Sequence, residues 1–384
     1  MIDEARRLVP RFAARAERHD RAGEFPAEDF ADLRAAGLFG LMVPKRLGGA
    51  GAGFADYAAI AYELARGNGA TALTFNMHAS VTGALSGVTD ELADALGLPP
   101  EALQARDDHL AAAATGSWYA VAMSERGAGS RLSRMTTSYE AVDGGYRIRG
   151  AKTFCSGAGH ADGYLIAARS SADESQVSHF LAPAGEGLRV EQTWDSLGMR
   201  ATGSNDLHID LTVPAGALLG GVEGLALVVA QLAPHWMVAS YAAVYVGVAR
   251  AAVDAAVEHV NDRKLGHLPA VRARIGRADA AVSAAHLAVQ EAARRVDEAP
   301  GDAETNRWVW RAKLLAGTTA AEVAASMLEA AGTSAMRRGH PLERLYRDAR
   351  AGSLQPATSD VCADWLGVDA LGGDADTDGV VPRW

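Results

Sequence analysis

The hydrophobic pattern changes its period twice along this 384-residue chain, and this change constrains the fold more than any other feature. Residues 1–115 are rich in Ala, Leu, Arg and Glu and repeat with the period of a helix. Residues 116–220 form short alternating runs between turn residues, which is typical of strands, and residues 221–384 return to long alanine-rich helices. This order predicts an α+β protein with an N-terminal helical domain, a middle antiparallel β-domain of roughly six to eight strands and a C-terminal helical bundle.

Individual elements follow from the same pattern. A glycine-rich break at 43–53 separates two helices, Asp143-Gly144-Gly145 predicts a hairpin, and Pro234 predicts a kink or a helix start. The predicted helices include 54–66, 70–86, 92–110, 222–262, 270–297, 302–331 and 356–366. The final stretch, GGDADTDGVVPRW, is expected to form an ordered or frayed tail.

Composition disfavours several classes of function. The chain is 49% hydrophobic, so it can bury a large core, and its length predicts two or three domains. A formal net charge of −10 argues against nucleic acid and anionic membranes as partners, because an acidic surface repels phosphates. Cys155 and Cys362 fit no metal-binding spacing, so free thiols in a reducing, cytoplasmic compartment are expected. Polar residues interrupt the apolar stretch 225–249, which predicts a buried helix rather than a membrane span.

A glycine-rich stretch is the first candidate for chemistry. It reads AVAMSERGAGSRLSRMTT at 120–137, and its strand is expected to end at Met123. The following turn exposes backbone N–H groups and the hydroxyls of Ser124 and Ser130, which can hold a phosphate or the polar edge of a flavin. An ordinary loop would give the same pattern, so this stretch alone leaves both interpretations open.

Five blocks of the sequence, in the right order, resemble those of the acyl-CoA dehydrogenase superfamily. They are GLFGLMVPKRLGGAGAGFADY, VAMSERGAGSR, GYRIRGAKTFCSGAGHADGYLIAAR, WDSLGMRATGSNDLHIDLTVPAGALLG and ERLYRDAR. The resemblance implies an α-domain, a β-barrel and a four-helix bundle, in a homotetramer or dimer that holds a flavin between barrel and bundle. Expected boundaries are 1–115, 116–220 and 221–384.

The same resemblance assigns cofactor residues. Phe154 would lie beside the isoalloxazine ring, where an aromatic side chain suits a flat π-system, and Ser156 would hydrogen-bond the ring. The residues expected to line the flavin are Val121, Met123, Ser124, Gly129 and Ser130.

The superfamily's catalytic base is missing at both of its usual places. Ordinary members abstract the α-proton of a thioester with a glutamate after the Arg-Asp-Ala-Arg motif, where this chain has Pro356. Relatives that carry the base on the first bundle helix would have it at Met237. The nearest ionisable substitutes are Asp360 and His235, although Asp360 also suits the first turn of a helix and His235 a helix start or packing position.

The nucleotide end of the cofactor site departs from the family pattern as well. The signature's final aspartate is Arg131, and LEAAGTS at 328–334 replaces a glycine-rich motif that in relatives clamps the FAD adenine from a neighbouring subunit. The resemblance implies FAD as the cofactor, and the loss of this clamp leaves FMN possible. Two interpretations of Arg263 and Lys264 stay open: one of them binds a cofactor phosphate, or the two form a solvated basic pair.

The superfamily also includes monooxygenases that lack the glutamate and use reduced flavin and oxygen. Some carry a histidine after the early glycine-rich break, where this chain has His78. The segment SGAGHAD resembles a monooxygenase-like variant and places His160 in a turn, while Gln355 stands near the missing base. Packing or surface positions would explain either histidine equally well.

Three hypotheses for function follow. The first is a dehydrogenase with a displaced base, acting on an acyl thioester of CoA or a carrier protein with an electron-transfer partner. The second is a monooxygenase that hydroxylates a small molecule through C4a-hydroperoxyflavin, with reduced flavin supplied by a reductase. The third is a non-catalytic flavin-binding homologue. The sequence names no substrate.

Overall fold

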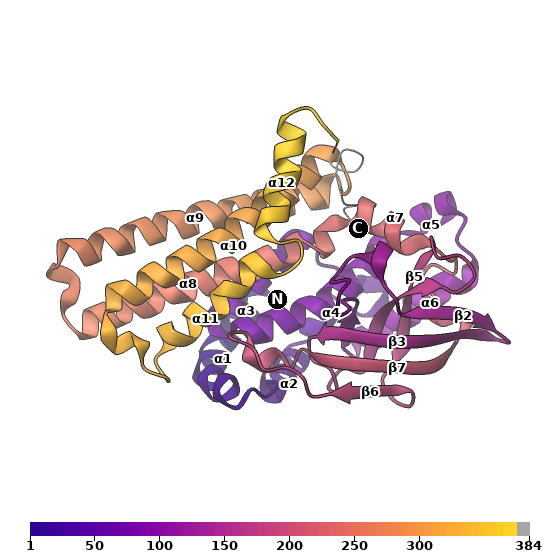
Figure 1. The fold of residues 1–384 in the computed structure, drawn as a ribbon, viewed down its shortest axis with the longest axis horizontal. Helices are drawn as coiled ribbons and strands as arrows, with labels where there is room; N and C mark the ends of the chain where they lie inside the picture. The colour runs from indigo at the N-terminus through magenta and orange to yellow at the C-terminus, as the bar shows by residue number, and fades with distance from the viewer. Residues whose placement is uncertain (375–384) are drawn as a thin grey trace.

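The computed structural model describes residues 1–374. A curled sheet lies at one side of the molecule, and helices from both ends of the chain pack beside it. Figure 1 shows the long bundle helices on the left, the sheet on the right and several N-terminal helices between them. The three-part architecture predicted from the sequence is confirmed. Residues 375–384 of the expected tail lie outside the described part of the chain.

The N-terminal part is helical, and one predicted helix is divided. Its elements are α1 (Ile2–Ala22), α2 (Ala27–Ala35), η1 (Leu38–Gly40), η2 (Lys45–Leu47), α3 (Phe54–Gly67), α4 (Gly69–Gly87), α5 (Asp90–Leu96) and α6 (Pro100–Ala114). The single helix predicted over 92–110 was wrong, because Gly97 ends α5 in a left-handed conformation and Pro100 starts α6.

The sheet has seven strands in the order β1-β4-β2-β3-β7-β6, and β5 pairs with β4. The strands are β1 (Tyr119–Ala122), β2 (Ser138–Val142), β3 (Gly145–Cys155), β4 (Gly163–Ser170), β5 (Val177–Pro183), β6 (Leu188–Glu191) and β7 (Asn205–Pro214). The predicted hairpin is confirmed, since β2 and β3 pair across Gly144. An entirely antiparallel sheet was wrong, because β4 runs parallel to both β1 and β2. The long glycine-rich connection after β1 allows this arrangement, which a tight hairpin would forbid.

Four long helices form the bundle, and a fifth packs against its end. They are α8 (Ala239–Asp262), α9 (Pro269–Glu298), α10 (Ala303–Ala331), α11 (Pro341–Leu354) and α12 (Ser359–Ala370). The predicted helix 222–262 is interrupted: α7 (Leu225–Leu232) ends before Pro234, which starts the short turn η6 (Pro234–Trp236). Sequence periodicity missed α11, because its inner face carries buried charges as well as apolar side chains.

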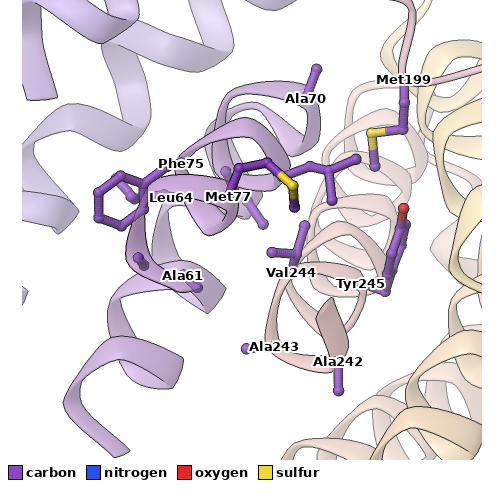
Figure 2. Close-up of a cluster of buried hydrophobic side chains, with 14 of the residues drawn as sticks. Ala61, Leu64, Ala70, Phe75, Met77, Met199, Ala242, Ala243, Val244 and Tyr245 are labelled. Atoms are coloured by element: carbon purple, nitrogen blue, oxygen red, sulfur yellow. The ribbon is translucent and has the colours of Figure 1, made fainter. Parts of the chain in front are cut away.

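The core continues from the N-terminal helices into the bundle. Figure 2 shows side chains of α3, α4 and α8 packed together, with Met199 reaching in from the sheet side towards Tyr245. The apolar segment Pro234–Asp262 is long enough to cross a membrane, with a mean hydropathy of 1.4. However, 78% of its most apolar window is buried inside the protein, as expected for a core helix.

Candidate functional site

The glycine-rich turn begins where β1 ends at Ala122. Glu125 and Gly129 pair across it through two N–H···O bonds of 2.9 Å. Gly127 and Gly129 have φ angles of 86° and 63°, which favour glycine. The expected cofactor residues of this stretch are the half-buried Val121, Met123, Ser124 and Ser130 and the exposed Gly129. The turn therefore presents backbone and hydroxyl groups at the edge of the sheet, as a ligand cradle requires.

A buried ion pair holds this turn in place. The Glu125 carboxylate accepts hydrogen bonds from Lys152 Nζ at 2.7 Å, from Thr136 N at 2.6 Å and from Thr137 N at 2.9 Å. Burial would raise the pKa of Glu125, but the Lys152 ammonium and the Thr136 hydrogen bonds outweigh it and lower the pKa to about 2. Glu125 is thus an ionised structural group, and the hydrogen bonds to its carboxylate connect the two ends of the glycine-rich turn to β3.

The Phe154 side chain projects from β3 at a bulge in the pairing of β3 with β7. Its φ of 58° is unusual for a non-glycine residue, and its side chain is 62% exposed. The edge of the ring meets Trp194, with ring centroids 6.0 Å apart. A large aromatic ring held outwards by a strained backbone is the feature that best fits a flat ligand at this site.

Replacing Phe154 with alanine is expected to weaken flavin binding by roughly 10-fold, because the stacking surface is lost. Fluorescence titration of free flavin measures the effect. Leu96→Ala, which truncates another exposed side chain on α5, serves as the control and should leave the affinity unchanged. Equal affinity in the Phe154 variant and the control would show that the flavin ring lies elsewhere.

The segment between β6 and β7 docks on α11. Met199 N donates to Asp348 Oδ1 at 2.6 Å, and Arg347 Nη1 donates to Leu197 O at 3.0 Å. A Cβ at Gly198 would lie 2.2 Å from Arg347 O, so only glycine allows this approach. Trp194 Nε1 in turn donates to Met199 O at 3.2 Å. The two motifs LGMR and RDAR therefore join sheet to bundle and position Trp194 beside Phe154.

His78 is engaged by the backbone on both sides of its ring. Nδ1 accepts from Tyr119 N at 3.1 Å, and Nε2 donates to Phe39 O at 2.8 Å. Burial lowers the pKa of His78 to about 4, so the ring is neutral. With both nitrogens occupied, His78 joins α4 to β1 and to η1 and leaves no atom free for a substrate, contrary to the expected catalytic role.

The two substitute bases are not brought together. His235 is buried, with its ring centroid 5.3 Å from that of Phe54 and 5.5 Å from that of Trp236, and burial lowers its pKa to about 4. Asp360 is exposed in the first turn of α12, behind the N-cap Thr358. This arrangement favours a packing role for His235 and a helix-dipole role for Asp360.

The structure adds residues that the sequence did not single out. Trp194, Thr202 and Ser204 lie around the predicted pair Phe154 and Ser156, and the Ser156 hydroxyl is 2.9 Å from that of Ser204, while Lys152 holds the glycine-rich turn through Glu125. All four belong to the blocks that carried the resemblance, which was the available signal. His160 stacks on Phe25, with ring centroids 4.2 Å apart.

Known proteins match this chain along nearly its whole length. Models of the N-terminal, middle and C-terminal domains of acyl-CoA dehydrogenase match residues 1–93, 120–212 and 239–359. L-evernosamine nitrososynthase of a Micromonospora species is 30% identical, over 98% of this chain and 91% of the relative. The chain belongs to the acyl-CoA dehydrogenase family.

Two further proteins are similar to this chain along nearly its whole length. A putative acyl-CoA dehydrogenase of Bacillus subtilis, YdbM, is 28% identical over 95% of both chains. The crystal structure of KijD3 with FMN and dTDP-3-amino-2,3,6-trideoxy-4-keto-3-methyl-D-glucose has a TM-score of 0.84 at 27% identity, and covers 97% of this chain and 94% of the other. The chain is thus a flavin-dependent oxidoreductase of the acyl-CoA dehydrogenase family.

The segment that carries the base in acyl-CoA dehydrogenases is held by a buried lysine here. Lys313 Nζ donates to the carbonyls of Gly352, Gln355 and Ala357 at 2.8, 3.0 and 2.8 Å. The Gln355 side chain accepts from the Tyr245 hydroxyl at 2.7 Å, and Pro356 is exposed. The segment is therefore anchored, while the described residues at this position offer no side chain that takes a proton.

Arg263 lies apart from the other expected cofactor residues. It is exposed and directly follows α8. The connection from α8 to α9 is at the end of the bundle farthest from the sheet (Figure 1). Within one chain, Arg263 therefore does not meet Phe154, and its role in cofactor binding stays a prediction that needs a neighbouring subunit.

Proposed function

We propose that this protein is an FMN-dependent monooxygenase that acts on a small molecule. Reduced FMN, oxygen and substrate would give oxygenated substrate, oxidised FMN and water. A separate reductase would supply the reduced flavin. The nitrososynthase relative and the FMN complex of KijD3 support this proposal, because a nitroso group carries an oxygen atom on nitrogen.

One observation carries the proposal. Pro356 and Met237 stand where dehydrogenases of the family place their base, and neither side chain accepts a proton. Asp360 is exposed and His235 is enclosed by aromatic rings, so neither substitutes within the described structure. Removal of a thioester α-proton needs a positioned base, whereas oxygen transfer from a flavin does not.

Met237 lies in apolar surroundings. Met237 and Met123 of the glycine-rich turn both pack against a buried apolar cluster to which α7 contributes Ala226 and Ala230. Such an apolar wall would keep water away from a ligand bound beside it. Bound flavin would supply the oxygen chemistry, while Phe154 orients its ring and the turn after β1 holds its polar edge.

Anaerobic mixing with an acyl thioester tests the proposal. The protein, loaded with oxidised FMN, is mixed with butyryl-CoA, and the flavin absorbance is followed. No bleaching is expected. Pro356→Glu and Met237→Glu restore a carboxylate at the two family positions and serve as matched variants, in which slow bleaching would report that only the base was missing. Bleaching in the unmodified protein would overturn the proposal in favour of a dehydrogenase.

A homo-oligomer remains part of the proposal. Exposed apolar side chains along α9 and α10, including Leu287 and Leu315, provide surface for a second copy. Such a copy would also bring an Arg263 to the flavin phosphate. Light scattering of the flavin-loaded protein tests this point, and a monomer would remove the assigned role of Arg263.

A further inference from the structure

Three buried hydroxyls form a continuous chain beside Phe154. The Ser156 and Ser204 hydroxyl oxygens are 2.9 Å apart, and those of Ser204 and Thr202 are 2.6 Å apart. All three residues are at least nine-tenths buried, with exposures of 7%, 5% and 0%. Within the described residues, Ser156 and Ser204 have no other side-chain hydrogen-bond partner, so each hydroxyl depends on its neighbour in the chain.

A carbonyl at the inner end sets the direction of this chain. Met199 O can only accept, and the Thr202 hydroxyl, at 2.9 Å, is the nearest of the donors that converge on it. Each hydroxyl has one hydrogen. Because Thr202 gives its hydrogen to Met199 O, Ser204 must donate to Thr202, and Ser156 must donate to Ser204. Ser156 is left with lone pairs on its open side and no hydrogen to give.

The residue that carries this carbonyl is anchored to the bundle. Met199 has a φ of 53°, and its N–H donates to the buried Asp348 at 2.6 Å. Arg344 Nη1 donates to the other carboxylate oxygen of Asp348 at 3.1 Å. The Met199 carbonyl itself also accepts from Thr202 N at 3.1 Å and from Trp194 Nε1 at 3.2 Å, so it cannot turn away without losing these contacts. The chain of hydroxyls is therefore attached to a rigid point.

A flavin changes one hydrogen-bonding atom when it is reduced. Its N5 accepts a hydrogen bond in the oxidised ring and carries a hydrogen to donate in the reduced ring. A hydroxyl that can only accept therefore matches the reduced form at N5 and opposes the oxidised form. We propose that the open side of Ser156, which the sequence resemblance places against the flavin ring, faces N5, and that the chain Thr202–Ser204–Ser156 presets this site for reduced flavin, so that the protein takes up its cofactor already reduced. The inference deepens the proposed function and rests on it for the identity of the ligand.

Reversal of the chain is possible but unfavourable. Ser156 could donate outwards only if it stopped donating to Ser204, and every such arrangement of the three hydroxyls leaves one hydrogen bond of the chain unmade. This loss inside a buried site corresponds to roughly a 5-fold preference for the direction described. Variants that release the inner end should therefore remove the preference.

Thr202→Val and Ser204→Ala test the inference by anaerobic titration with FMN and with dithionite-reduced FMN. The unmodified protein should bind reduced FMN more tightly than oxidised FMN. Both variants should bind oxidised FMN more tightly than the unmodified protein does and lower the ratio of the two affinities by roughly 5-fold. Thr115→Val, which removes an exposed hydroxyl at the end of α6, is the control and should keep the ratio.

Two results would overturn the inference: an unchanged ratio in both variants, or equal weakening of both forms, which a purely structural role would give. Ser204→Ala only removes an oxygen atom, so it tests the inference even if Thr202→Val fails to fold. The titration contains neither oxygen nor substrate. An unchanged ratio in a working monooxygenase would therefore refute the inference alone, and an altered ratio without oxygen transfer would refute the proposed function alone.

Discussion

Lowering the pH from 7 to 4.5 is expected to destabilise the protein by several kcal/mol, because burial keeps three histidines neutral in the fold. Burial lowers the pKa of His78, His179 and His235 to about 4, against about 6.5 in an unfolded chain. Between these values the unfolded chain binds more protons than the fold. Their contribution is complete above pH 6.5 and is lost as the pH falls towards 4, by up to about 3 kcal/mol for each residue.

Urea unfolding at pH 7, 6 and 5 measures this loss. His235→Phe, in the aromatic surroundings of Phe54 and Trp236, should reduce the pH dependence by the share of one histidine. His267→Gln, at an exposed position before α9, is the control and should leave the dependence unchanged. A free energy of unfolding that stays constant from pH 7 to pH 5 would contradict the burial of these three rings.

Glu125→Gln is expected to cost about 3–5 kcal/mol of stability and to loosen the flavin-binding turn. The substitution keeps an oxygen acceptor but leaves the fully buried Lys152 ammonium without its counter-charge. The neighbouring pair of Arg126 and Asp206 offers a matched control, since the Arg126 side chain is 73% exposed. Arg126→Ala should cost no more than about 1 kcal/mol.

Thermal unfolding and flavin titration measure both effects of Glu125→Gln. The buried variant should lose several degrees in Tm and bind flavin more weakly, while the Arg126 variant stays close to the unmodified protein. Equal stability of the two variants would mean that the turn does not depend on the buried pair.

The sequence predicted the order of the three parts because the hydrophobic period reports which face of each element is buried. It did not predict α11, whose inner face carries the buried charges of Arg344, Arg347 and Asp348. Those charges are satisfied by groups distant in sequence, such as Met199 N. The parallel pairing of β1 with β4 was missed for a similar reason, since it depends on a long connection.

The position of a candidate site residue could be predicted where a sequence motif contains it. Its role could not be predicted where that role depends on hydrogen-bond partners distant in the sequence. Phe154 and Ser156 follow from their block, and the exposed ring of Phe154 agrees with its expected contact. The sequence pattern makes His78 a candidate catalytic residue, but Tyr119 N and Phe39 O occupy its two ring nitrogens. The direction of the hydroxyl chain at Ser156 depends on Met199 O, which lies 43 positions along the sequence and could not be inferred from the pattern.

Labelling with ¹⁸O₂ tests the central claim most directly. The protein is supplied with FMN, NADH, a flavin reductase and ¹⁸O₂, together with probes that offer nitrogen, sulfur or carbon: a dTDP-linked amino sugar, thioanisole and indole. Oxygen transfer predicts one labelled atom in the product of at least one probe and the other in water. Label confined to hydrogen peroxide with every probe, together with anaerobic bleaching of the bound flavin by butyryl-CoA, would contradict the account and identify a dehydrogenase.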